Sequence, residues 1–217
     1  VVLKKLLSLG SADNRDELIL SIPQTYSRAG DKARVASAVR EALKEELAGG
    51  PHAAAAWTTV GRLELAAGQT ADALASAQRA QAASVRSRHP AVLALELMED
   101  NASRSAAESL VQRYLAVARN GDAPVQLAYA RTLLELQRPA DALRQVEDVA
   151  ALPDAPADAS LLLGNIHARA NRDQPARQAL ERYLKQTEGQ DNDSSERGRT
   201  QAFLLLAQLA EKAKDYT

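Results

Sequence analysis

Three histidines are the side chains whose chemistry is weighed first. His52, His89 and His167 could each ligate a metal ion or transfer a proton near neutral pH. A metal site on a helix pairs such a residue with a second histidine or a carboxylate at i+4, and none of the three has that partner. The sequence therefore predicts no metal site and no bound cofactor.

A group of carboxylates is the second candidate for chemistry. Glu96, Glu99 and Asp100 cluster at the end of one predicted helix, where they could bind a cation or act as a general base. Such runs are more often a solvated helix face, which is the interpretation we favour. The sequence has no GxSxG elbow, no GxxxxGK[ST] phosphate loop and no GxGxxG after a strand. We predict that this chain is not an enzyme.

The composition favours an all-α protein. Apolar residues make up 46% of the 217 residues but aromatic residues only 3%, so the apolar surface comes mainly from Ala, Leu and Val. Ala and Leu are strong helix formers, whereas β-branched and aromatic runs of strand length are almost absent. Helices built from such small side chains must pack closely to form a core.

The charge and the cysteine count exclude several classes of partner and site. Lys and Arg total 27 against 28 for Asp and Glu, which leaves no net charge to attract nucleic acid. The absence of cysteine excludes disulfides and thiolate chemistry and leaves cytoplasm and periplasm equally open. No apolar run approaches the roughly 18 residues of a membrane helix. We expect no nucleic acid partner and no membrane span.

Proline spacing indicates internal repeats. Pro90 and Pro124 lie 34 residues apart and Pro156 follows 32 later, each at the start of a helical pattern, where a proline loses no hydrogen bond. The clearest unit opens at Trp57–Gly61, with Gly68 in a turn and Ala73 on the next helix. This pattern resembles the tetratricopeptide repeat (TPR).

A second copy of the pattern is similar to the same family. Leu163-Gly164 matches the Leu-Gly pair of the repeat, Ala176 takes the small position of its second helix, and Tyr183 follows. His167 stands where the family pattern has Tyr, and Glu64 does so in the first unit, so we interpret His167 as a histidine packed between helices. Trp57 is likewise interpreted as a packing residue.

The resemblance implies a right-handed superhelical solenoid of antiparallel helix pairs, whose small residues sit where helices cross. It also suggests a fragment of a longer bacterial TPR protein. The predicted parts are a trailing helix at 1–12, repeats at 16–50, 54–87, 88–121, 123–156 and 157–190, a polar loop at 191–199, and the first helix of a further repeat at 200–217. Pro23 is expected to bend or break its helix.

The same resemblance implies where a partner would bind. In TPR proteins the concave wall is built mostly from first helices, and the matching positions here form a mixed surface of arginines, carboxylates and leucines. They are Thr58, Arg62, Glu96, Glu99, Leu127, Arg131, Leu134, Leu161, Asn165, Arg169, Leu204 and Gln208. The Lys/Asn clamp of chaperone cofactors is absent, because Leu162 and Ala168 flank Asn165.

Three functions remain open at this point. The first is a scaffold or adaptor that binds a peptide or partner protein on its concave face, in the bacterial periplasm, at the outer membrane or in the cytoplasm. The second is a docking or regulatory region of a larger envelope-associated enzyme or assembly. The third is a self-association module that forms a homo-oligomer through its end helices.

Overall fold

The computed structural model describes residues 14–118, 121–190 and 192–213, and within these ranges every regular element is helical, as predicted. The predicted helix at 1–12 lies outside the described residues, as do residues 214–217. The single body predicted from the sequence divides into two compact units, 1–120 and 121–217, which are described separately.

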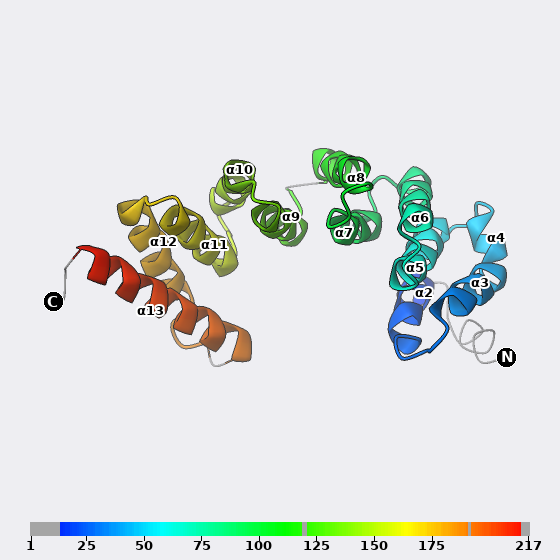
Figure 1. Ribbon diagram of the computed structural model, residues 1–217, viewed down its shortest axis with the longest axis horizontal. Helices are drawn as coiled ribbons and strands as arrows, with labels where there is room; N and C mark the ends of the chain where they lie inside the picture. The colour runs from blue at the N-terminus through cyan, green and yellow to red at the C-terminus, as the bar shows by residue number, and fades with distance from the viewer. Residues whose placement is uncertain (1–13, 119–120, 191, 214–217) are drawn as a thin grey trace. The chain divides into compact units, whose positions relative to one another are not determined.

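The first unit contains two helical hairpins and the helices that precede them (Figure 1). Its helices are α2 (Arg15–Thr25), α3 (Lys32–Ala42), α4 (Lys44–Leu47), α5 (Ala53–Ala66), α6 (Thr70–Ala83), α7 (Arg88–Leu97) and α8 (Arg104–Val117). Helix α5 pairs with α6 and α7 pairs with α8, while α2 and α3 both pack on α5. Ile19, Val39 and Val60 share one buried core at that junction.

The second unit contains two further hairpins and one long helix (Figure 1). Its helices are α9 (Ala123–Glu135), α10 (Pro139–Ala150), α11 (Ala157–Arg169), α12 (Asp173–Gln186) and α13 (Asp193–Ala213). Helix α9 pairs with α10, α11 pairs with α12, and α13 packs on both α11 and α12. Leu180, Tyr183 and Leu209 belong to the core that joins the last two of these helices.

Three hairpin turns share one backbone geometry. Gly68, Gln137 and Asn171 each follow the first helix of a pair and have φ of 78°, 59° and 55°. The next N–H donates to the carbonyl five residues earlier in each case, as in Arg138 to Leu133, which caps the helix end. Gln137 and Asn171 are 34 residues apart, so the turn recurs at one repeat length.

Two glycines lie where neighbouring helices pack closely. A Cβ on Gly61 of α5 would lie 2.7 Å from Leu93 Cδ2 and 3.2 Å from the carbonyl oxygen of Ala73 on α6. A Cβ on Gly164 of α11 would lie 2.6 Å from Leu180 Cδ2 on α12. These are the glycines of the two repeat patterns recognised in the sequence, so that pattern is a packing requirement.

Two local predictions are wrong. Helix α2 continues through Pro23 to Thr25 without the expected break, because another helix provides the hydrogen bond that the proline removes. The polar segment at 191–199 is not a loop from Asp193 onward but forms the first turns of α13. Ser195 and Gly198 are buried there, and Gly198 lies against Tyr183 of α12 and Leu161 of α11.

The helix pairs lie where the predicted repeats place them, but they do not determine the residue at which each repeat begins or ends. Pairs α7–α8, α9–α10 and α11–α12 fall inside the predicted repeats 88–121, 123–156 and 157–190, and α5 starts one residue before the predicted repeat at 54. In the described ranges no helix is both long enough and apolar enough to cross a membrane.

Candidate functional site

The first-helix surface is the solvent-facing side of α5 and α7 in the first unit and of α9, α11 and α13 in the second. In the first unit it carries Arg62 on α5, Glu96 on α7 and Glu99 in the turn that follows α7, three of the predicted residues. Both glutamates are exposed and Arg62 is half-buried. The Nε of Arg62 is buried and has no hydrogen-bond partner among the described residues.

Burial and neighbouring charges shift the pKa values of Glu96 and His89. Although much of Glu96 is exposed, the protein around its carboxyl group raises its pKa, while Arg62 opposes that shift and Glu99 adds to it. Burial lowers the pKa of His89, and the positive charges of Arg62 and Arg88 lower it further. His89 is therefore mainly neutral at neutral pH, although the negative charge of Asp16 opposes the lowering of its pKa.

In the second unit one predicted arginine already has a partner. Arg131 on α9 forms an ion pair of 2.8 Å with Asp158 on α11, and both side chains are about half exposed. Asn165 is half-buried and Arg169 is exposed, both on α11. Both arginines are therefore exposed, and Arg131 already has an acidic partner on the neighbouring helix.

The apolar members of the predicted set differ in exposure. Leu134 on α9 and Leu161 on α11 are half-buried, and Leu161 packs against the core of the last three helices. Leu204 on α13 is 61% exposed, and Gln208 one turn later is also exposed. Phe203 beside them, which the prediction did not include, is 56% exposed.

Two residues of the predicted set do not reach a partner. Thr58 is fully buried on α5, and its hydroxyl donates to the carbonyl oxygen of Ala54 at 2.7 Å. Leu127 on α9 is 3% exposed. Their assignment to a partner-binding surface is wrong, because both side chains face neighbouring helices and not solvent.

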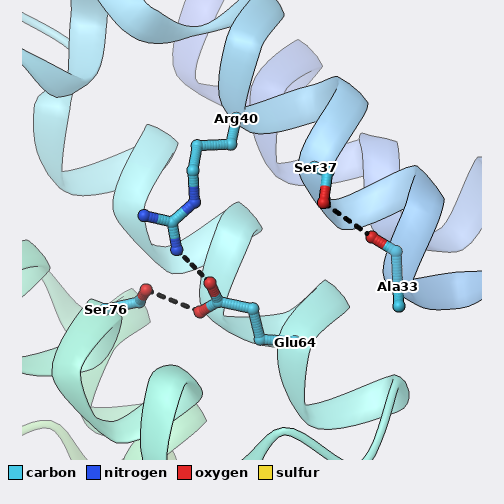
Figure 2. Close-up of polar contacts among 5 residues, drawn as sticks. All are labelled: Ala33, Ser37, Arg40, Glu64 and Ser76. Carbon is cyan, nitrogen blue, oxygen red and sulfur yellow. Dashed lines mark hydrogen bonds and ion pairs between the residues drawn. The ribbon is translucent and has the colours of Figure 1, made fainter.

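A buried polar cluster in the first unit was not predicted. Glu64 on α5 is 4% exposed and is paired with Arg40 on α3 (Figure 2). The hydroxyl of Ser76 on α6 donates to the second carboxylate oxygen of Glu64 at 2.6 Å. Three helices thus converge on one carboxylate, at the position where the family pattern has Tyr.

Trp57 lies beside this cluster, and its contacts confirm the prediction that it is a packing residue. The guanidinium carbon of Arg79 lies 4.6 Å from the centre of the indole ring and that of Arg40 lies 5.5 Å from it. The indole Nε1–H donates to the carbonyl oxygen of Leu47 at 3.2 Å. The half-buried ring is therefore packed by two cations and a backbone contact.

The other two histidines have separate local environments. His52 Nδ1 lies 2.8 Å from Asp16 Oδ1, and His167 is half-buried with a pKa that burial lowers. No group of three metal-ligating side chains occurs within residues 14–118, 121–190 and 192–213. The accessible charged residues are suited to holding another protein through ion pairs and hydrogen bonds.

Comparison with known proteins identifies the fold. No family model matches this sequence, and no curated protein sequence matches it. The structure of PilF from Pseudomonas aeruginosa matches with a TM-score of 0.62 at 16% identity, covering 94% of this chain and 86% of that chain. A tetratricopeptide repeat protein from Parabacteroides merdae matches with a TM-score of 0.60 at 14% identity, covering 92% and 77%.

Proposed function

We propose, from the premise that this chain has the fold of tetratricopeptide repeat proteins, that it is a protein-interaction scaffold. Its partner is a protein or peptide that carries both charges, and it binds to the first-helix surface. The proposal rests chiefly on the patch formed by Arg62 on α5, Glu96 on the adjacent helix α7 and Glu99 in the turn after α7.

The geometry of that patch favours binding by another chain. Arg62 has a buried Nε and retains four terminal N–H donors in a planar fork, which is the geometry that holds a carboxylate. The carboxylates of Glu96 and Glu99 can accept hydrogen bonds from a cation of the same partner. A partner with alternating charges would therefore find complementary groups on both helices.

Residue-specific crosslinking tests this proposal. A photoreactive amino acid placed at Glu99, an exposed residue in the turn after α7, should give a defined crosslinked species in the native cell. The matched control places it at Glu181, an exposed glutamate on the second helix α12. Arg62→Glu should abolish the species and Arg182→Glu should leave it unchanged, because only the first removes the carboxylate-binding fork from the patch.

The opposite results would contradict the proposal. The same crosslinked species from both positions, or a species that persists in Arg62→Glu, would show that the patch on α5 and α7 does not select the partner. The prediction that this chain docks or regulates a larger envelope-associated enzyme would be tested by the identity of the crosslinked protein.

Self-association is a second candidate, favoured by one observation. Phe203 and Leu204 are adjacent on α13 and are 56% and 61% exposed, which is unusual for two large apolar side chains on one helix. Light scattering across a range of concentrations should show a dimer that Phe203→Glu dissociates. A mass that stays monomeric at every concentration would exclude this candidate.

A further inference from the structure

We propose that the first unit has a second binding surface, a groove between α6 and α8 that takes an acidic peptide with apolar neighbours. The groove has a volume of about 600 Å³ and is independent of the first-helix surface. Its walls include Gln78, Ala82 and Val85 on one side and Ser109, Leu110 and Arg113 on the other.

The floor of the groove is fixed by a buried hydrogen bond. Gln81 on α6 is 5% exposed, and its side-chain Nε2 donates to the carbonyl oxygen of Leu110 on α8 at 2.7 Å. This bond holds the two helices at a constant separation, because breaking it would leave a buried amide without a partner. The groove is therefore a formed surface that a ligand can occupy without first opening it.

The charge of the groove is positive. Arg113 is exposed and makes no hydrogen bond or ion pair with the described part of the chain, and no carboxylate lines the groove. Arg86, which directly follows Val85, is exposed as well. A guanidinium that is free of acidic partners is complementary to a carboxylate, which it can bind through two parallel N–H donors.

Exposed apolar side chains flank the same arginine. Val85 lines the groove and is 43% exposed, and Val117, one helical turn after Arg113, is 41% exposed. No other large apolar side chain is exposed to this degree among the described residues of the first unit. Arginine is enriched in protein interfaces, and a bound peptide would cover the two exposed valines beside it.

These features favour a peptide over a phosphate backbone. A nucleic acid would need several cations along its path, whereas one free arginine lines this groove and valines flank it. An extended segment with a Glu or Asp between apolar residues could place its carboxylate on Arg113 and its apolar side chains on Val85 and Val117. The amides of Gln78 and the hydroxyl of Ser109 could bind its backbone.

The test uses a fluorescein-labelled octapeptide of alternating Leu and Glu and the whole chain. Fluorescence anisotropy should show saturable binding, and the same peptide with Lys in place of Glu should not bind. Arg113→Glu should weaken binding at least tenfold. Arg182→Glu, the same charge change on an exposed residue of α12, should change it less than twofold.

Chemical-shift mapping separates this surface from the first-helix surface. The amide signals that move on adding the peptide should fall within residues 78–85 and 106–113. Shifts along α5 and α7 would place the peptide on the first-helix surface and overturn the inference, as would unchanged affinity in Arg113→Glu or no saturable binding up to millimolar concentration. Tighter, Arg113-dependent binding of a double-stranded oligonucleotide would overturn it in favour of a phosphate site.

Discussion

The hydroxyl of Thr59 on α5 donates a buried hydrogen bond of 2.8 Å to the carbonyl oxygen of Ile19 on α2. That carbonyl lies four residues before Pro23, whose ring nitrogen has no proton to donate. The acceptor that the proline leaves without a helical partner is thus satisfied by a neighbouring helix. This contact explains why α2 continues to Thr25 despite an internal proline.

Thr59→Val should destabilise the first unit by about 1 to 3 kcal/mol, because it leaves the buried Ile19 carbonyl without a donor at nearly constant side-chain volume. Chemical denaturation followed by circular dichroism measures the change.

Two further variants control this prediction. Thr58→Val removes an equally buried hydroxyl that bonds only to a carbonyl within its own helix, so it should cost less. In a Pro23→Ala background the new backbone N–H can bond to Ile19, and Thr59→Val should then cost little. An equal cost of Thr59→Val in both backgrounds would disprove the proposed link.

Arg40→Ala should also destabilise the first unit, because it leaves the carboxylate of Glu64 buried without its cation. Since 42% of the Arg40 side chain is exposed, solvent compensates in part, and we expect a loss of about 1.5 kcal/mol. The free energy of unfolding in denaturant measures it.

A double-mutant cycle with Glu64→Ala separates the ion pair from the contact of Arg40 with Trp57. Arg40→Ala should cost much less when Glu64 is already absent. Arg79→Ala, which removes a ring contact but no partner of Glu64, should cost less than Arg40→Ala in the native background. If the losses of stability caused by Arg40→Ala and Glu64→Ala were strictly additive, this would argue against the ion pair.

Gly198→Ala should destabilise the second unit although alanine is the better helix former by about 1 kcal/mol. A Cβ there would overlap the hydroxyl oxygen of Tyr183 and lie 2.8 Å from its Cζ, and Tyr183 is 2% exposed. We expect a net loss of about 1 to 3 kcal/mol, measured by thermal unfolding.

Whether Gly198→Ala lowers or raises the stability of the second unit is the informative result. Tyr183→Phe removes the overlapping oxygen, so Gly198→Ala should cost less in that background. Gly30→Ala, where no atom lies within 4 Å of the added Cβ, is the neutral comparison. A gain in stability for Gly198→Ala would mean that α13 does not pack on Tyr183 as described.

Acidification should destabilise the chain through its partly buried histidines. Burial lowers the pKa of His89 and His167 below the ordinary 6.5, so the unfolded chain binds protons before the folded chain does. The free energy of unfolding should be constant above about pH 7 and fall as the pH decreases through 6.5. Denaturation series at several pH values measure this.

Replacing both histidines isolates their share. The variant with His89→Gln and His167→Gln should show a smaller fall between about pH 7 and pH 5.5 than the native chain, because it lacks the two groups that must stay neutral on folding. Identical slopes for the two proteins in that window would assign the pH dependence to other groups.

The helical class and the hairpin crossings could be predicted because they depend on local pattern. Gly61 and Gly164 follow an apolar residue at the spacing that the repeat requires, and the structure places both against second helices. The first prolines of α9 and α10 likewise mark helix starts in the sequence itself.

Features that depend on several helices could not be predicted. The pattern places Glu64 at an aromatic position but does not show that Arg40 and Ser76, from two other helices, complete its hydrogen bonds. The same holds for Pro23, whose effect depends on the bond between Thr59 and Ile19, two residues forty positions apart. Thr58 was assigned to the surface because the frame fixes the helix but not which neighbour covers each side chain.

The carboxylate of Glu64 limits how this protein can change by duplication. A repeat with an apolar interior can be copied or moved along a stack, because any neighbour of similar shape covers it. The α5–α6 hairpin instead requires a preceding helix that supplies a cation at the position of Arg40. Copied to a place without that cation, it would hold a buried charge unpaired, so this hairpin is bound to its position in the chain.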